Sequence, residues 1–366
     1  MAERKYIPAF TGIRALCAYG IFFYHVAPFS QVDHPGLFLL ADQFYSFIPF
    51  FFVISGFVIF YTYYKEERYS KKDLKNYFIS RFARIIPILV ILNTAVFLLA
   101  YRDHLYSAWE SVKLYLLNIS LLKGFSSNYI LTGIGPSWTN SIEEIFYLLA
   151  PLLFVFIKRK GFLFWFILFF YLLGLLFSLF FIHYPWQGLF SSYAFTAYFT
   201  FFGRVFEFAT GIYLAMLFMG KYKNRLLEKN AGFALPAGLV LLIAAFALQY
   251  NIAAYYHVPH ANEAWPGIIV NNFLFPVAIF FILYHLLFGR SILKRFLASP
   301  LMVNLGNSTY SFYLLHTTFV LSWIHKFISE NVLVTFLCMI VVSFIFYKLV
   351  EQPLAKLIKQ NFTSKT

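Results

Sequence analysis

Long apolar runs alternate with short polar segments along the whole chain. Ten runs approach the roughly 20 residues that a helix needs to cross a bilayer; they cover residues 9–29, 43–64, 78–100, 138–157, 161–182, 192–219, 232–250, 267–288, 302–324 and 332–350. The runs are too long, and too helical in period, for the strands of an outer-membrane barrel, which alternate over roughly ten residues. The pattern predicts an all-α polytopic membrane protein, a bundle of about ten transmembrane helices.

The composition agrees with this fold class. Of the 366 residues 61% are hydrophobic and only 12% are charged, against about 25% charged residues in soluble domains. The 50 Phe and 27 Tyr residues fit a large lipid-facing surface with aromatic belts. Cys17 and Cys338 both lie in predicted spans, which indicates neither a disulfide nor a metal site. No small-residue cleavage site follows a short apolar core, so we expect the first span to be its own insertion signal.

The net charge of +14 is arranged by membrane side and not as a nucleic-acid surface. If every run crosses, 23 of the 29 basic residues fall on the side of both termini and four on the other, with Arg14 and Arg204 inside spans. The positive-inside rule then predicts an N-in, C-in orientation. The basic segments are the N-terminus, residues 65–76, 158–160, 221–229 and 289–295, and the C-terminal tail.

The longest segment on the opposite side is residues 101–137. Residues 110–123 (ESVKLYLLNISLLK) are typical of an amphipathic helix at the outer interface, and GIGPSW (133–138) is expected to re-enter the membrane. No soluble domain or repeat is evident. We therefore expect one transmembrane domain over residues 1–353 and a short basic cytoplasmic tail over residues 354–366.

Arg14 and His25 are unusual in an apolar helix. Eleven helical residues turn through about 1100° and rise about 16 Å, so the two side chains share one face, with Arg14 near the cytoplasmic end. Arg14 is either a snorkelling helix-end residue or part of a site, and His25 is either a hydrogen-bonded core residue or a chemical group.

Other spans also carry polar groups. Ser55 and Gly56 favour close helix packing over chemistry, because a serine nucleophile needs a positioned base. Arg81 and Arg84 are i,i+3 neighbours suited either to phosphate groups or to lipid headgroups. Glu143 and Glu144 point about 100° apart; one of them could orient a histidine or receive a proton, or be stabilised by the helix dipole.

Three further positions are expected to be mainly structural. Arg204 and Glu207 are i,i+3 and can pair within the membrane. His316 is either a second polar contact in the core or a satisfied histidine. Glu351 precedes Pro353, which is expected to stop the helix at the cytoplasmic face, and it can pair with a nearby cation.

Taken in order, these segments resemble one known family. They are Arg14 with His25, FFVISGF (51–57), RFARIIP (81–87), SWTNSIEEIFYLLAP (137–151), RVFEF (204–208), LGNSTYSFYLLH (305–316) and YKLVEQP (347–353). Together they resemble the acyltransferase-3 family of integral-membrane acyltransferases over nearly the whole chain. Asn140 departs from the apolar residue usual at its position and adds polarity beside Glu143.

The resemblance implies transfer of an acyl group, most often acetyl, from cytoplasmic acyl-CoA to a hydroxyl of a cell-surface or exported glycan, in the bacterial cytoplasmic (inner) membrane. It implies that His25 is catalytic with support from Glu143, and that Arg14, Arg81 and Arg84 contact acyl-CoA. Ser55, Trp138, Tyr147, Arg204, Glu207, Tyr310, His316 and Glu351 are expected to be supporting or structural polar residues. Many relatives carry an additional extracytoplasmic domain after the bundle; this chain ends about 13 residues after EQP and is expected to lack one.

The expected partners are acyl-CoA as donor substrate, a glycan or lipid-linked saccharide acceptor, and membrane lipids. No metal, permanently bound cofactor or nucleic acid is expected. The sequence is compatible with a homo-oligomer and does not decide the oligomeric state. Neutral His25 would act as general base for direct transfer, which we favour over an acyl-histidine intermediate. The rival interpretation is a transporter or exporter of a glycan or lipid-linked intermediate, and a third is an inactive relative that acts as a scaffold.

Overall fold

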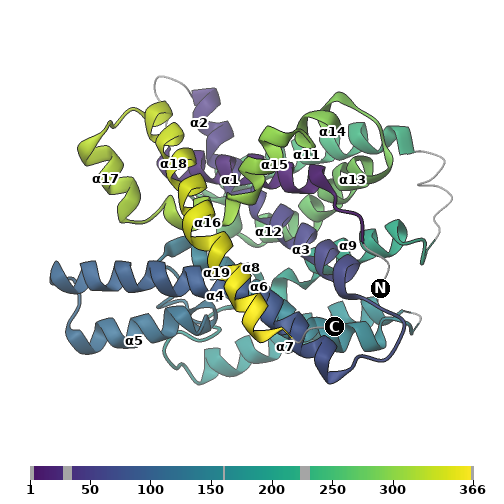
Figure 1. Ribbon diagram of the computed structural model, residues 1–366, viewed down its shortest axis with the longest axis horizontal. Coiled ribbons are helices and arrows are strands. Elements are labelled where there is room, and N and C mark those ends of the chain that lie inside the picture. Colours follow the sequence, from purple (N-terminus) through teal and green to yellow (C-terminus); the bar gives the residue numbers. More distant parts are fainter. Residues whose placement is uncertain (1–3, 28–34, 160, 223–230, 364–366) are drawn as a thin grey trace.

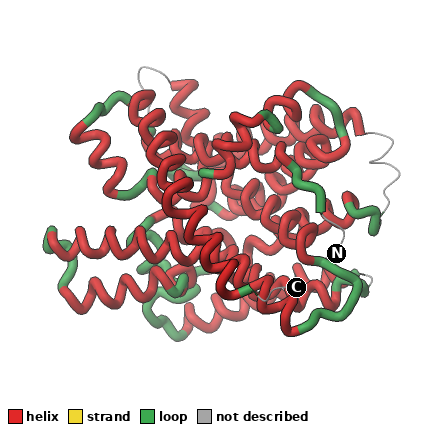
Figure 2. The backbone as a smooth tube through the Cα atoms, viewed as in Figure 1, coloured by secondary structure: helices red, strands yellow, loops and turns green. Residues whose placement is uncertain are grey.

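The fold is known from a computed structural model that describes residues 4–27, 35–159, 161–222 and 231–363. Over these residues every regular element is a helix (Figures 1 and 2), which confirms the predicted fold class. The α-helices are α1 (Pro8–Val26), α2 (Pro35–Asp42), α3 (Ile48–Tyr63), α4 (Lys71–Arg102), α5 (Ala108–Ile119), α6 (Trp138–Phe156), α7 (Phe162–His183), α8 (Tyr193–Phe199), α9 (Phe201–Phe218), α11 (Ala234–Tyr256), α12 (Trp265–Ile269), α13 (Phe275–Phe288), α14 (Ile292–Leu297), α15 (Pro300–Asn307), α16 (Thr309–Leu315), α17 (Phe319–Phe327), α18 (Val332–Phe346) and α19 (Gln352–Phe362).

Eight helical segments in the described part of the chain are long and apolar enough to cross a membrane. They are Gly36–Tyr63, Lys71–Arg102, Gly135–Phe156, Phe162–His183, Tyr193–Phe218, Ala234–Tyr256, Trp265–Phe288 and Val332–Phe362, and each matches one of the ten predicted runs. The two remaining runs are α1, which carries Arg14 in its interior, and residues 302–324.

The prediction of a single helix over residues 302–324 is wrong, because this run is divided into α15, α16 and α17. Short polar side chains at the breaks bond to the local backbone: Ser308 Oγ donates to the Leu305 carbonyl, and Thr318 Oγ1 donates to the Leu315 carbonyl. Such bonds compete with the helical ladder. The breaks leave His316 immediately after α16, at the end of a short helix.

The prediction that Pro353 stops the last helix is also wrong. A π-helical turn, η7 (Tyr347–Glu351), joins α18 to α19, and Pro353 lies in the first turn of α19. A proline lacks an N–H group and crowds the preceding turn, and a π-helical turn is a common place for such an irregularity. Most of the predicted cytoplasmic tail is therefore helix α19, which packs against α4.

Helices α3 and α9 pack together very closely through glycine. A Cβ atom on Gly56 would overlap the Phe208 carbonyl of α9, and one on Gly211 would overlap the Val53 carbonyl of α3. Close approach of two backbones is the usual use of small residues in membrane helices. This contact confirms the packing role inferred for Gly56.

Contacts between loops gather four of the predicted basic segments at one end of the bundle: the N-terminus and the segments that contain Glu66, Lys158 and Lys221. Arg4 donates to the Tyr64 carbonyl, while Lys158 and Lys221 both bond to Glu66. At the opposite end, the Ser127 backbone N–H donates to the Gly188 carbonyl. We call these the basic end and the opposite end. Lys160 and residues 223–229 of the predicted basic segments, and residues 364–366 of the tail, lie outside the described residues.

Helices α4 and α5 form a hairpin that extends from the rest of the bundle (Figure 1). With 32 residues, α4 is about 48 Å long and exceeds the roughly 30 Å of a hydrocarbon core. Helix α5 confirms the predicted amphipathic helix over residues 110–123. It begins earlier because Ser107 and Glu110 form a capping box, and it ends earlier because Leu121 adopts a left-handed conformation with φ 61°.

Candidate active site

Helix α1 carries Arg14 and His25 to two different cavities. Arg14 lines two small cavities of about 50 and 60 Å³ toward the basic end. His25, in the last turn of α1, lines a large cavity of about 900 Å³ at the opposite end. The eleven-residue separation therefore places a permanent cation and an imidazole about 16 Å apart along one helix.

The imidazole of His25 is paired with a second histidine. Its Nδ1 lies 2.9 Å from Nε2 of His316, and Nδ1 of His316 lies 3.3 Å from the Phe312 carbonyl oxygen. A carbonyl only accepts hydrogen bonds, so Nδ1 of His316 carries the proton and its Nε2 accepts from Nδ1–H of His25. This order leaves the lone pair on Nε2 of His25.

The arginines predicted to hold acyl-CoA meet in the second small cavity. Arg14, Arg81 and Arg84 line it together, from α1 and α4. Arg81 donates to the Tyr63 hydroxyl at 3.0 Å and lies 5.9 Å from the ring centre of Tyr147. Three guanidinium groups around one cavity form a local concentration of positive charge suited to an anion.

Glu143 belongs to this arginine-lined region. It lines both small cavities and accepts a hydrogen bond from the Tyr147 hydroxyl at 3.0 Å, while Ser55 Oγ donates to Tyr147 at 3.3 Å. The partner that the structure gives Ser55 is thus a hydroxyl and not a base. Among the described contacts, His316 and not Glu143 lies against His25.

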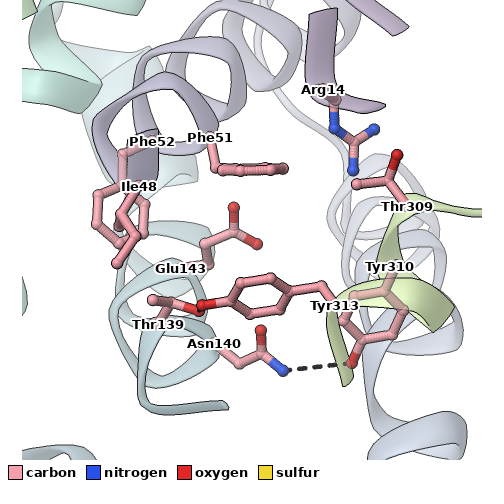
Figure 3. A pocket seen from close by; sticks show the side chains of 10 residues that line it. All are labelled: Arg14, Ile48, Phe51, Phe52, Thr139, Asn140, Glu143, Thr309, Tyr310 and Tyr313. Carbon is pink, nitrogen blue, oxygen red and sulfur yellow. Dashed lines mark hydrogen bonds between the residues drawn. The ribbon is translucent and has the colours of Figure 1, made fainter. Parts of the chain in front are cut away.

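The cavities follow one another through the bundle. The two small ones share Arg14, Phe51, Glu143 and Tyr310, and the first of them (Figure 3) shares Ile48 and Tyr313 with the large one. In Figure 3, Arg14 on α1 and Glu143 on α6 extend toward the same space, and Asn140 donates to Tyr310 at 3.3 Å. Neighbouring cavities with shared wall residues therefore lie between the arginines and His25.

The predicted supporting residues lie around these cavities. Tyr310 donates to the Ile85 carbonyl at 3.1 Å, which ties α16 to α4. Trp138 lines the large cavity and packs edge-on against Phe199. Glu351, buried in the π-helical turn, accepts from Ser311 Oγ at 2.5 Å.

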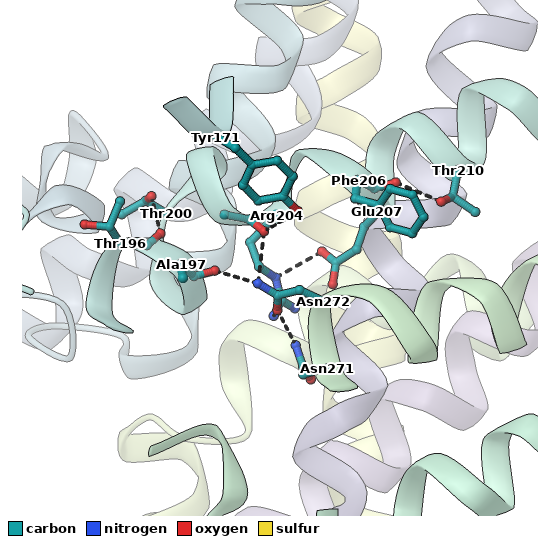
Figure 4. Close-up of polar contacts among 11 residues, drawn as sticks. Tyr171, Thr196, Ala197, Thr200, Arg204, Phe206, Glu207, Thr210, Asn271 and Asn272 are labelled. Carbon is teal, nitrogen blue, oxygen red and sulfur yellow. Dashed lines mark hydrogen bonds and ion pairs between the residues drawn. The ribbon is translucent and has the colours of Figure 1, made fainter. Parts of the chain in front are cut away.

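Arg204 and Glu207 form a separate, fully buried pair (Figure 4). Their side chains are 0% exposed, and Arg204 Nε lies 3.0 Å from Glu207 Oε2. Arg204 also donates to Asn272 Oδ1 at 2.8 Å, and Asn272 donates to the Ala197 and Gly203 carbonyls. The pair, which lines none of the three cavities, confirms the predicted pairing within the bundle.

Sequence reasoning did not single out Lys123 as a buried group. Its side chain is fully buried, and Nζ donates to the Thr132 and Ile134 carbonyls at 2.8 and 2.9 Å. Burial lowers the pKa of Lys123 to about 7. The amine holds residues 132–134 in place at the wall of the large cavity, next to Gly133.

A second group at the large cavity was also missed. Tyr24, Asp42 and Glu263 all contact His260 there. The signal available in the sequence was the polar segment HVPHANE (257–263) between two apolar runs, which has no recognisable spacing. Asp42 and Tyr24 come from distant helices, so only folding brings them to His260.

The fold and site define a polytopic helical membrane protein with a row of neighbouring cavities between a cluster of arginines and a histidine pair. Within this class the chain belongs to the acyltransferase-3 family, because the family model described as "Acyltransferase domain" matches residues 7–348. This confirms the resemblance seen in the motifs.

Curated relatives agree with the family. The chain is 24% identical over 382 residues to a Staphylococcus aureus (strain COL) protein named "Putative O-acetyltransferase", covering 97% of this chain and 58% of the relative. It is 29% identical over 170 residues to the O-acetyltransferase OatA of Staphylococcus aureus (strain NCTC 8325), covering 44% of this chain and 26% of OatA. This chain therefore spans little more than half the length of the first of these relatives. No solved structure matches the chain.

Proposed function

We propose that this protein is a membrane-embedded O-acyltransferase that moves an acetyl group from acyl-CoA, bound at the basic end, to a hydroxyl of a glycan in the large cavity. The supporting observation is the series of cavities that share lining residues from Arg81 and Arg84 to His25. The O-acetyltransferase names of the relatives favour acetyl among the acyl groups.

The proposal includes ten crossings with both ends of the chain in the cytoplasm of a bacterium. Ten crossings require α1 and the run α15–α17 to span together with the eight long segments. Support comes from the loop contacts that gather Arg4, Glu66, Lys158 and Lys221 at one end and from the excess of basic residues assigned to it. Acyl-CoA, a cytoplasmic anion, would then enter at the arginine-lined cavity.

In the proposed reaction, Nε2 of His25 takes the proton of the acceptor hydroxyl as its oxygen attacks the thioester carbonyl carbon. The tetrahedral intermediate collapses, the carbon–sulfur bond breaks, and the sulfur leaves with the proton from His25. The products are the O-acyl ester and CoA with a free thiol. His316 accepts from Nδ1–H throughout and stabilises the imidazolium, as an orienting group does in other catalytic pairs.

The first test is His25→Ala in protein reconstituted into liposomes with acetyl-CoA. We expect acyl transfer to be abolished while insertion and the thermal transition are retained, since His25 is open to the cavity and not part of the sealed core. His183→Ala, which alters an exposed histidine at the end of α7, is the matched control. Near-normal transfer by His25→Ala would refute the assignment.

The second test addresses the donor site. We expect Arg84→Ala to raise KM for acyl-CoA more than it lowers kcat, because a phosphate contact far from the reacting carbon stabilises the ground state and the transition state equally. Arg159→Ala, an exposed arginine at the same end, should leave KM unchanged. Equal KM values for Arg84→Ala and the parent protein would instead make Arg84 a lipid anchor.

A further inference from the structure

His260, which lines the large cavity, is held between two carboxylates. Its Nδ1 lies 3.3 Å from Glu263 Oε1, and its Nε2 lies 3.6 Å from Asp42 Oδ1 and 3.1 Å from the Tyr24 hydroxyl. The interaction with the Asp42 carboxylate, followed by that with Glu263, raises the pKa of His260 above its usual value of 6.5. Four groups from α1, the end of α2 and the segment before α12 thus form one cluster.

This arrangement directs the Tyr24 hydroxyl toward a ligand. When both ring nitrogens of His260 carry protons, Nε2–H donates to the Tyr24 oxygen. The O–H of Tyr24 is then free to donate, beside His25, whose ring centre lies 5.0 Å from that of Tyr24. Tyr24 and His25 line the same cavity.

The same wall presents acceptors for hydrogen bonds. Glu263 lines the cavity with a side chain that is 49% exposed. The neighbouring Asn262 also lines it, and its buried Oδ1 has no hydrogen-bond partner among the described residues. The Asn262 side chain also hydrogen-bonds the side chain of Tyr198, which lines the same cavity, so its free oxygen is held at the cavity wall, where it can accept from a ligand hydroxyl.

The rest of the cavity is aromatic and holds no fixed cation. Its aromatic lining includes Tyr45, Trp138, Tyr198 and Phe199, and no lysine or arginine is among the described residues that line it. Aromatic faces suit the C–H face of a sugar ring, because the π face is electron-rich. An anionic group in this cavity would meet the Glu263 carboxylate, with Asp42 behind His260, whereas acyl-CoA is proposed to meet three arginines at the other end.

We propose that Tyr24, Asn262 and Glu263, with Asp42 and His260 as positioning residues, form an acceptor subsite that binds an uncharged sugar ring through its hydroxyls and rejects acidic sugars. The inference rests on the proposed function and narrows its acceptor from glycans in general to neutral sugar units. The bound hydroxyl would lie next to His25, where its proton can be removed.

The test measures CoA release and acetylated product with liposome-reconstituted protein, acetyl-CoA and matched pairs of acceptors. The pairs are methyl glucuronamide with methyl glucuronide, and methyl galacturonamide with methyl galacturonide, which carry the same hydroxyls and differ in an uncharged amide against a carboxylate. We expect the parent protein to use at least one neutral member and to use its acidic partner at least tenfold less efficiently. Equal use of the two, or use of neither neutral glycoside while acetyl-CoA still binds, would overturn the proposal.

Variants then separate recognition from chemistry. Glu263→Gln and Tyr24→Phe should each raise KM for the neutral acceptor about tenfold, with kcat and KM for acetyl-CoA within twofold of the parent. Glu263→Gln should also reduce discrimination against the acidic partner. The matched control is Asp103→Asn, which alters an exposed carboxylate paired with Arg102 at the same end. It should change neither KM for the neutral acceptor nor the discrimination against the acidic partner.

The outcomes distinguish this inference from the proposed function. A fall in kcat without a change in acceptor KM, in both variants, would refute the subsite. If CoA release depends on His25 but only acidic acceptors are used, the enzyme assignment stands and the neutral-sugar subsite fails. If CoA release is the same in His25→Ala, the proposed function itself fails.

Discussion

The histidine pair makes a prediction that the structure can quantify. His316 is fully buried, lies against Phe312 and Phe22, and has one contact that bears on catalysis, the acceptance of Nδ1–H from His25 at 2.9 Å. Replacing it with phenylalanine keeps an aromatic ring in an apolar setting and removes the acceptor for His25, together with the Nδ1–H contact to the Phe312 carbonyl. His25 would then lose the bond that selects its tautomer and stabilises its imidazolium form.

The size of the effect follows from the bond that is lost. A hydrogen bond to a group that becomes charged is worth about 1.5–3 kcal/mol, and each 1.36 kcal/mol in the barrier changes the rate about tenfold. We therefore expect His316→Phe to lower kcat by about 10- to 100-fold. KM for acyl-CoA should stay the same, because His316 does not line the arginine-lined cavities.

The assay is CoA release at saturating acetyl-CoA in liposomes, with the thermal transition recorded for each variant. His316→Gln is the matched control, since its side-chain oxygen can accept from His25, and it should recover most of the rate. The reasoning is wrong if His316→Phe retains kcat within twofold. It is also wrong if His316→Phe and His316→Gln lose activity equally while both remain folded.

Three further predictions concern stability. Glu207→Gln should lower the free energy of unfolding by about 3–5 kcal/mol, because it leaves Arg204 as an uncompensated buried charge; the thermal transition in detergent measures this, and replacing both residues by methionine should restore most of the loss. The pKa of Lys123 is about 7 in the folded protein and 10.5 for the free side chain. Between these two pH values the unfolded chain binds more protons than the folded protein, so the free energy of unfolding should rise with pH. Melting curves recorded from pH 7 to 10 should show this rise in the parent protein and lose it in Lys123→Met. Gly56→Ala should cost about 1–3 kcal/mol through overlap with α9, whereas Gly36→Ala, with no atom within 4 Å of the new Cβ, should be close to neutral in the same melting assay.

Much of the architecture could be predicted from the chain alone. Length and hydropathy locate helices with modest error, since a bilayer demands long apolar segments whose backbone bonds are internal. The predicted pairing of Arg204 with Glu207 was confirmed. Residues at i,i+3 lie on one helix face, and a buried charge is costly unless an opposite charge pairs with it. The helix breaks near Ser308 and Thr318 were missed because local bonding by short polar side chains competes with a hydropathy signal that continues across them.

The grouping of the candidate site could be predicted only in part. Periodicity placed Arg14 and His25 on one face, and the resemblance to a family attached roles to them and to Arg81 and Arg84. The positions of Glu143 against Tyr147, and of His316 against His25, depend on contacts between helices that are distant in the sequence. The same is true of His260, which is separated from Tyr24 by 236 residues.

The sequence by itself determined the membrane-spanning class, the family, and the separation of Arg14 from His25, because these depend on hydropathy, motif order and the pitch of a single helix. Only the tertiary structure decided which nitrogen of His25 is free, which residues line the cavities between the arginines and His25, and which groups surround the large cavity. Those features depend on side chains from several helices meeting in space, and no local pattern specifies how helices pack against one another.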